Sequence, residues 1–110
     1  MPRRRGKHYH VYVVELDPSV LDRKKFRDRN PGYRAGKPCV YVGMTGLTPA
    51  RRFANHKRGY KANAFARDYG WELRPDLFPD GNPFTYADAQ EMERFVADEL
   101  RRLGYGVWQE

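Results

Sequence analysis

A threonine between two glycines divides residues 39–56, CVYVGMTGLTPARRFANH, into an apolar run and a basic segment. Thr48 and Pro49 are typical of a helix start, where free backbone amides and the helix dipole favour a bound anion. The turn lacks the Gly-Lys-Ser/Thr ending of a P-loop and the spacing of a dinucleotide fingerprint. We therefore expect either a purely structural strand-to-helix turn or a phosphate contact at Gly43 and Thr45.

The segment after the turn predicts a helix over residues 49–58 that carries a guanidinium and an imidazole. Arg52 and His56 are four residues apart, so they lie on the same face of the helix. Together they can hold a phosphate group and the charge that develops on it during a reaction. A solvated basic face is the alternative interpretation. The apolar side of the helix is predicted to consist of Ala50, Phe53 and Ala54.

Two tyrosines lie inside strand-like apolar runs, Tyr12 in VYVV and Tyr41 in CVYV. Tyrosines in strands usually pack in the core or against a neighbouring strand, although their hydroxyl groups can reach a cleft at the sheet edge. A phenol has a pKa of about 10, which makes it a poor base at neutral pH unless a metal or an arginine lowers that pKa.

A glutamate on a later helix is the candidate metal ligand. This helix is predicted to begin at Thr85 or Asp88 and to end near Leu103, and Glu93 lies at the margin of its apolar face. A carboxylate at the edge of a core is costly unless it is paired or bound to a metal, and Mg²⁺ often takes only one or two carboxylates. A solvated or salt-bridged glutamate is the alternative. The apolar face is predicted to contain Ala89, Met92, Val96, Leu100 and Leu103.

A small α+β fold must position these side chains. Residues 8–16 and 37–43 predict two paired strands, and the polar residues 17–37 between them are interpreted as an insertion. The other predicted elements are a strand over 71–77, a short strand at 107–108 and a short helix over 61–69. We expect a mainly antiparallel three-stranded sheet flanked by helices, within a single domain of residues 8–110.

The charge balance favours a polyanionic partner. The 110 residues contain 21 Lys+Arg against 14 Asp+Glu, for a formal net charge of +7. A surplus of this size on a small domain is typical of nucleic-acid binding, with an incidentally basic protein as the alternative. Residues 1–7, MPRRRGK, are expected to form a basic flexible tail.

Several classes of protein are disfavoured. Cys39 is the only cysteine, which excludes an intramolecular disulfide and a zinc site built on thiolates. No apolar run approaches the roughly 18 residues of a membrane span, so we expect no membrane contact. The basic start of the chain is not followed by an apolar signal region, and we expect a cytoplasmic protein.

Four short patterns together resemble the GIY-YIG nuclease superfamily. Residues 41–43, Tyr-Val-Gly, match its second strand motif, and residues 10–12, His-Val-Tyr, stand where the first belongs. Residues 52–56 resemble its Arg-Leu-x-x-His helix pattern, and residues 89–93 resemble the Ala-x-x-x-Glu pattern of its metal-binding helix. The resemblance spans roughly residues 8–106 and implies the family's α+β fold.

Three features depart from the family pattern. His10 replaces the first glycine of the first motif, and the connection between the two motifs is longer than the usual hairpin loop. The asparagine that many members carry has no clear counterpart after Gly104. Counting from Tyr41 favours Arg51 as the family arginine, whereas the spacing to the histidine favours Arg52, which we prefer.

The resemblance implies an endonuclease that hydrolyses phosphodiester bonds with one divalent metal ion. Glu93 would hold Mg²⁺ or Mn²⁺, and Tyr41 or Tyr12 would orient or deprotonate the attacking water. Arg52 would stabilise the charge of the transition state. His56 would assist proton transfer, for which an ordinary imidazole pKa is suited.

Nucleic acid is the implied partner, with DNA the expected substrate and a protein partner as a further source of specificity. The residues expected to contact nucleic acid, besides those of the glycine turn, are Arg51, Lys57, Arg58 and Lys61. Such contacts position a backbone without reading its sequence. The alternatives are a non-catalytic nucleic-acid-binding module of the same fold and a small interaction protein whose charge is incidental.

Overall fold

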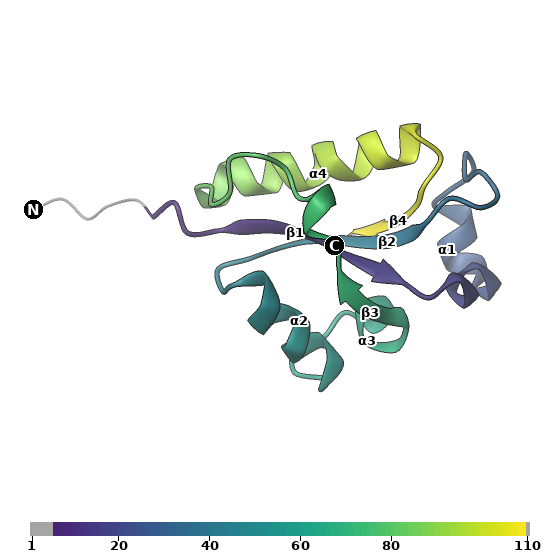
Figure 1. The fold of residues 1–110 in the computed structure, drawn as a ribbon, viewed down its shortest axis with the longest axis horizontal. Helices are drawn as coiled ribbons and strands as arrows, with labels where there is room; N and C mark the ends of the chain where they lie inside the picture. Colours follow the sequence, from purple (N-terminus) through teal and green to yellow (C-terminus); the bar gives the residue numbers. More distant parts are fainter. Residues whose placement is uncertain (1–5, 110) are drawn as a thin grey trace, which may run out of the picture.

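A four-stranded sheet with helices on both faces forms the body of the molecule in the computed structural model, which describes residues 6–109 (Figure 1). The predicted basic tail of residues 1–7 lies almost entirely outside the described residues. No helix within residues 6–109 combines the length and the apolar character needed to cross a lipid bilayer.

The sheet is mixed and has the strand order β3-β1-β2-β4. Strand β1 (His10–Leu16) pairs antiparallel with β2 (Cys39–Thr45) and with β3 (Gly70–Leu73). Strand β4 (Gly106–Gln109) pairs parallel with β2. The α+β class is therefore confirmed, but the prediction of a mainly antiparallel three-stranded sheet is wrong, because the chain end adds a fourth strand.

The segment between β1 and β2 helps to attach this fourth strand. It contains a 3₁₀ helix, η1 (Pro18–Asp22), and a short helix, α1 (Lys24–Asp28). After α1, the buried side chain of Asn30 donates to the Val107 carbonyl at 3.0 Å and accepts from the Val107 amide at 2.8 Å. The Asn30 carboxamide thus makes the two backbone hydrogen bonds to Val107 that a neighbouring strand would otherwise make. Sequence periodicity does not reveal this role.

Capping residues place the remaining helices where the sequence predicts them. The Thr48 hydroxyl accepts from the Arg51 amide at the start of α2 (Pro49–Lys57), and Thr85 caps α4 (Tyr86–Arg102) in the same way. Asn63 caps the shorter α3 (Ala64–Tyr69). A single 3₁₀ turn, η2 (Pro75–Leu77), follows β3.

The alternation of side chains along β1 and β2 produces two cores. Val11, Val13, Val40 and Val42 face α4 on one side of the sheet. Tyr12 and Tyr41 face the other side, which α2 and α3 cover (Figure 1). Both tyrosines are therefore directed toward the helix that carries the predicted arginine and histidine.

Candidate active site

Two tyrosines and one histidine meet between β1, β2 and α2. The Tyr12 hydroxyl lies 2.9 Å from His56 Nε2. The Tyr41 ring meets the same imidazole edge-on, with 5.4 Å between ring centroids, and the two tyrosine rings are 6.1 Å apart. All three side chains are at most 1% exposed. Residues separated by up to 44 positions thus form one cluster.

Gly43 leaves the space that this cluster occupies. It pairs directly with Tyr12 across the two strands. A β-carbon at position 43 would lie 2.8 Å from the Tyr12 hydroxyl and 2.9 Å from Tyr41 Cε2, closer than real β-carbons approach other atoms. Gly43 is itself buried. The structure therefore gives this glycine a steric role, while the expected phosphate contact stays a prediction.

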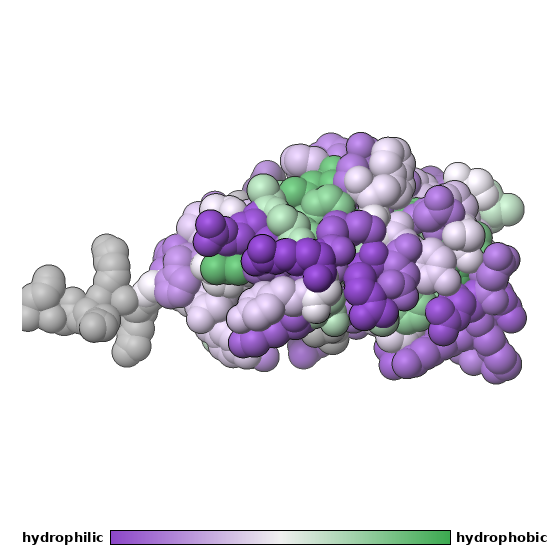
Figure 2. Space-filling model, turned by 90° about the horizontal axis from the view of Figure 1, so that it is seen from below, coloured by the Kyte–Doolittle hydropathy of each residue, from purple (hydrophilic) through white to green (hydrophobic). Residues whose placement is uncertain are grey.

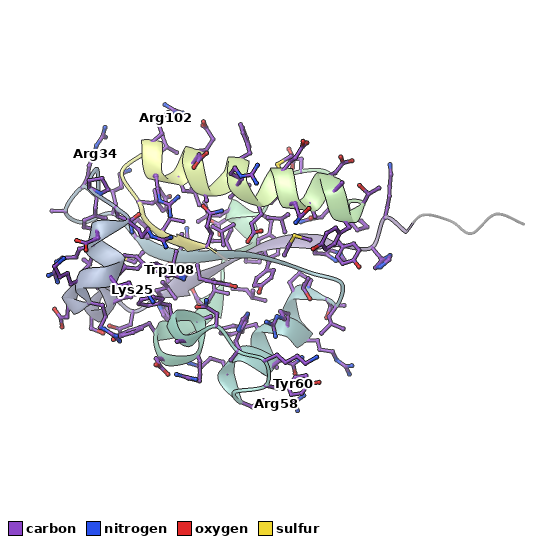
Figure 3. The ribbon with its side chains drawn as sticks, turned by 180° about the vertical axis from the view of Figure 1, so that it is seen from behind. Lys25, Arg34, Arg58, Tyr60, Arg102 and Trp108 are labelled. Carbon is purple, nitrogen blue, oxygen red and sulfur yellow. The ribbon has the colours of Figure 1, made fainter. Side chains whose placement is uncertain are left out.

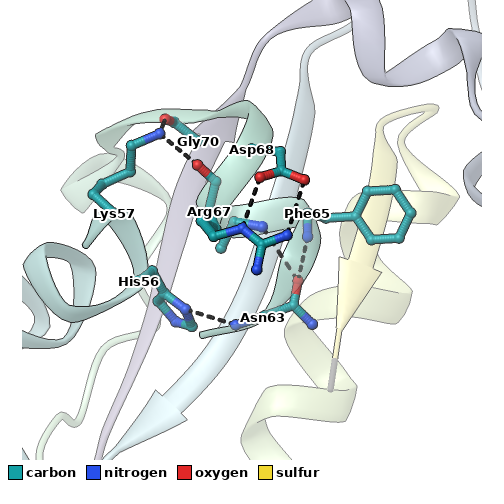
Figure 4. A network of polar contacts seen from close by, with 8 residues as sticks. His56, Lys57, Asn63, Phe65, Arg67, Asp68 and Gly70 are labelled. Carbon is teal, nitrogen blue, oxygen red and sulfur yellow. Dashed lines mark hydrogen bonds and ion pairs between the residues drawn. The ribbon is translucent and has the colours of Figure 1, made fainter. Parts of the chain in front are cut away.

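The hydrogen bonds of His56 define its tautomer. The backbone amide of Asn63 donates to His56 Nδ1 at 3.1 Å (Figure 4). An amide N–H can only donate, so Nδ1 presents its lone pair and the proton of the neutral ring sits on Nε2. His56 therefore donates this proton toward the Tyr12 oxygen, where it stabilises negative charge.

Burial, together with the smaller effect of the nearby Arg52 charge, lowers the pKa of His56 from 6.5 to about 4. The imidazole is consequently neutral at physiological pH. The expectation of an ordinary imidazole pKa suited to proton transfer is wrong for this reason. The structure instead shows a neutral ring that orients Tyr12.

The inward face of α2 is more polar than predicted. Asn55 and His56 are its buried residues, whereas Ala50 and Ala54 of the predicted apolar stripe are exposed. Phe53 is half-buried and packs against the tyrosine side of the core. Polar side chains can occupy the buried face because they find partners there.

Arg52 links the cluster to the loop after α2. Its guanidinium donates to the carbonyls of Lys61 at 2.8 Å and Tyr60 at 3.4 Å. Its effect on the His56 pKa places its charge near the imidazole, as the shared helix face predicts. Arg51 is exposed and points elsewhere on the helix, so the choice between the two arginines as the catalytic group stays a prediction.

Glu93 is more deeply buried than predicted. It is 7% exposed and lies in the sheet-facing stripe of α4 rather than at the margin. Leu103, expected in that stripe, is 43% exposed. Helices α4 and α2 cover opposite faces of the sheet, so Glu93 and His56 approach it from its two sides (Figure 1). The last described residue pair between β2 and β4 is Val42 with Gln109. From Gly43 onward, β2 has no described partner strand on its β4 side.

The described residues contain no ready-made cluster of metal ligands. Among residues 6–109, no group of three or more His, Cys, Asp or Glu side chains could enclose a metal ion. One carboxylate is sufficient for Mg²⁺ when water and phosphate oxygens complete its shell. A buried carboxylate also gains from a nearby cation.

The other residues expected to contact nucleic acid divide into two groups. Thr45 is buried and its hydroxyl accepts from the Leu47 amide at 3.0 Å. The Lys57 ammonium donates to two carbonyls at the end of α3, both at 2.7 Å (Figure 4). Arg58 and Lys61 are exposed, together with Tyr60 between them, which sequence reasoning missed.

Comparison with known proteins shows that this chain is similar to one part of a much longer protein. No family model and no solved structure matches the chain. The flavoprotein alpha-component of NADPH sulfite reductase from Neisseria meningitidis strain FAM18 is 28% identical over 116 residues, and the protein of the same name from strain MC58 is equally similar. The matches cover 87% of this chain, which spans only 19% of those relatives.

Proposed function

We propose that this chain is a GIY-YIG-type endonuclease that hydrolyses phosphodiester bonds in DNA with one divalent metal ion. The observation that carries the proposal is the 2.9 Å contact between the Tyr12 hydroxyl and His56 Nε2, with Tyr41 packed against the same imidazole. Hydrogen-bonded tyrosine and histidine side chains on adjoining elements are a means of orienting a nucleophile.

In this proposal the tyrosines act on the attacking water. His56 donates to the Tyr12 oxygen and thereby stabilises the phenolate form of Tyr12, which is the form that can accept a proton from the attacking water. Tyr41, on the neighbouring strand, orients the water or the phosphate. The cluster depends on Gly43, because any side chain there would displace both rings.

Arg52 and Glu93 provide the electrostatic part of the site. Arg52 is expected to stabilise the charge on the phosphate in the transition state, since a guanidinium retains further N–H donors after two are used. Glu93 would hold Mg²⁺ or Mn²⁺. A bound divalent ion supplies Lewis acidity and neutralises charge on the scissile phosphate.

The names of the relatives do not suggest a better function for this chain. Dinucleotide cofactors bind glycine-rich turns of parallel doubly wound sheets. The sheet described here is mixed, and the turn after β2 lacks the dinucleotide spacing. The match to those relatives also takes in only 19% of their length.

The proposal predicts metal-dependent DNA cleavage. The purified chain should nick supercoiled plasmid or branched DNA in Mg²⁺ or Mn²⁺ and should not do so in EDTA. Glu93→Gln should abolish nicking while DNA binding in EDTA is retained, because the substitution removes the carboxylate charge and little else. Glu91→Gln is the matched control, since Glu91 is exposed on the same helix.

Two outcomes would contradict the proposal. Binding that weakens steeply with salt, without cleavage of any DNA structure, would favour the non-catalytic binding module. Equal loss of nicking in Glu91→Gln and Glu93→Gln would remove the special role of the buried carboxylate.

A further inference from the structure

An exposed aromatic ring lies between two cations just after α2. The Tyr60 side chain is 53% exposed. The Arg58 guanidinium carbon lies 5.9 Å from the centroid of this ring, and the Lys61 ammonium lies 5.6 Å from it. Arg58 and Tyr60 project together from the end of α2 (Figure 3). Aromatic rings flanked by cations are typical of surfaces on which nucleobases stack.

The backbone that carries this ring is firmly held. The Tyr60 amide donates to the Asn55 carbonyl at 2.9 Å, and Arg52 donates to the carbonyls of Tyr60 and Lys61. Lys61 is the only described residue other than glycine with a positive φ, at 47°. The backbone at position 60 is therefore held in place, which reduces the entropy lost when the loop binds a ligand.

A hollow of about 470 Å³ lies beside the ring. It has both polar and apolar walls, and its volume falls within the roughly 300–1,000 Å³ of small-ligand sites. Its lining consists of Leu47, Arg51, Ala54, Asn55, Arg58 and Tyr60.

The surrounding charge is complementary to phosphate. Residues 46–67 contain no aspartate or glutamate. Their cationic side chains are Arg51, Arg52, Lys57, Arg58, Lys61 and Arg67, the last of which pairs with Asp68 on α3 at 2.7 Å. The face covered by α2 and α3 is largely hydrophilic (Figure 2). A polyanion with aromatic bases thus fits this surface better than an apolar or acidic peptide.

The ring is adjacent to the candidate active site. Arg52 follows the first turn of α2, and its guanidinium binds the carbonyl of Tyr60 while its charge acts on His56. Arg52 thus connects the backbone that carries the ring with the helix that carries His56, so a nucleotide on the ring would lie on the same side of the sheet as the cluster.

We propose that Tyr60 stacks an unpaired base of the DNA next to the phosphate that is cut, while Arg51, Arg58 and Lys61 hold the flanking phosphates. The inference rests on the proposed function for the identity of the substrate. Because every base has a π-face, stacking selects unpaired nucleotides and not a sequence. The preferred substrates are then single strands, overhangs and branch points, in preference to uninterrupted duplex.

Binding measured in EDTA tests this proposal without cleavage. Fluorescence anisotropy gives the affinity of each variant for a labelled single strand and for a blunt duplex. Tyr60→Ala should weaken single-strand binding roughly 5- to 150-fold, the loss of one base stack, and leave duplex binding almost unchanged. The substitution spares the loop, because the contacts at position 60 that hold it use backbone atoms. Tyr60→Trp should restore the affinity.

Tyr86→Ala is the matched control, since Tyr86 is 54% exposed but lies on α4. Quenching of a 2-aminopurine base in the bound single strand should be lost in Tyr60→Ala and kept in Tyr86→Ala. Equal losses on single strand and duplex, or unchanged single-strand affinity in Tyr60→Ala, would overturn the inference. Stacking without any cleavage in Mg²⁺ would instead overturn only the proposed function.

Discussion

Tyr12 and His56 determine each other's chemistry at the residue scale. The imidazole has one nitrogen facing the Asn63 amide and the other facing the Tyr12 hydroxyl, so burial is compatible with a neutral, hydrogen-bonded ring. A buried imidazolium would lack this arrangement, because Nδ1 would then carry a proton facing an N–H donor. The cluster is therefore matched to one protonation state.

This match predicts a dependence of stability on pH. The pKa of His56 is about 4 in the folded protein and 6.5 as the reference value, so below pH 6.5 the unfolded chain binds the extra proton. The free energy of unfolding should therefore fall as the pH falls from 6.5 toward 4. Protonation of His56 alone accounts for a loss of about 2 kcal/mol between pH 7 and pH 5. Urea unfolding at both pH values should show this loss in wild type and not in His56→Gln.

Two results would argue against this account of His56. One is an equal loss of unfolding free energy in wild type and His56→Gln. The other is an NMR titration of the His56 ring with a midpoint near 6.5, which would mean that the ring is not protected from water.

Part of this cluster follows from the sequence alone. Tyr12, Tyr41 and Gly43 fall on one face of two paired strands because side chains alternate along a strand. The pKa of His56 does not follow, since it depends first on how deeply the folded chain buries the ring. Tyr60 was missed because no periodic pattern marks an aromatic residue in an irregular loop.

At the scale of elements, α2 and α3 are joined by a lysine. The Lys57 ammonium donates to the carbonyls of Arg67 and Gly70, at the end of α3 where free carbonyls are concentrated. This contact joins the two helices that cover the tyrosine side of the sheet. Lys57 therefore has a structural role in addition to its expected contact with nucleic acid.

Lys57→Met should lower the free energy of unfolding by about 1–2 kcal/mol, because two carbonyls lose a charged donor. Lys24→Met is the matched control. Lys24 pairs with Asp28 on the exposed face of α1, and such surface pairs contribute less than about 1 kcal/mol. Equal unfolding midpoints for Lys57→Met and wild type in urea would show that this lysine does not join the helices.

The elements were only partly predictable. The positions of α2 and α4 were predictable from their capping threonines and the glycines that follow them. Both signals act locally in the sequence. The inward face of α2 was not predictable, since buried Asn55 and His56 rely on partners from other segments. A short strand at 107–108 was predicted, but its place in the sheet was not, since it pairs with β2 and is bonded by Asn30 from a segment interpreted only as an insertion.

At the scale of the whole molecule, charge is distributed unevenly. Residues 46–67 contain cationic side chains and no carboxylate, whereas α4, on the opposite face of the sheet, carries five carboxylates and three arginines. The net charge of +7 is evident from composition, but the fold is needed to see which face would meet a polyanion. The cationic residues therefore favour DNA on the side of α2 and α3, whereas Glu93 lies on the helix that covers the opposite face.

Salt dependence tests this placement. If three exposed cations, Arg51, Arg58 and Lys61, each neutralise a phosphate, the logarithm of the single-strand affinity should fall against the logarithm of salt with a slope of about −2. Arg51→Gln should make the slope shallower by about 0.7, whereas Lys24→Gln on α1 should leave it unchanged. Identical slopes for Arg51→Gln and wild type would place the DNA on another face.

The central claim, metal-dependent hydrolysis at the tyrosine–histidine cluster with Glu93, is tested most directly by one measurement. It is the initial rate of plasmid nicking in Mg²⁺ by wild type and Glu93→Gln, at protein concentrations that give equal DNA binding in EDTA. The account predicts nicking by wild type and none by the variant. Equal rates in the two proteins, or no nicking by wild type in Mg²⁺ or Mn²⁺, would contradict it.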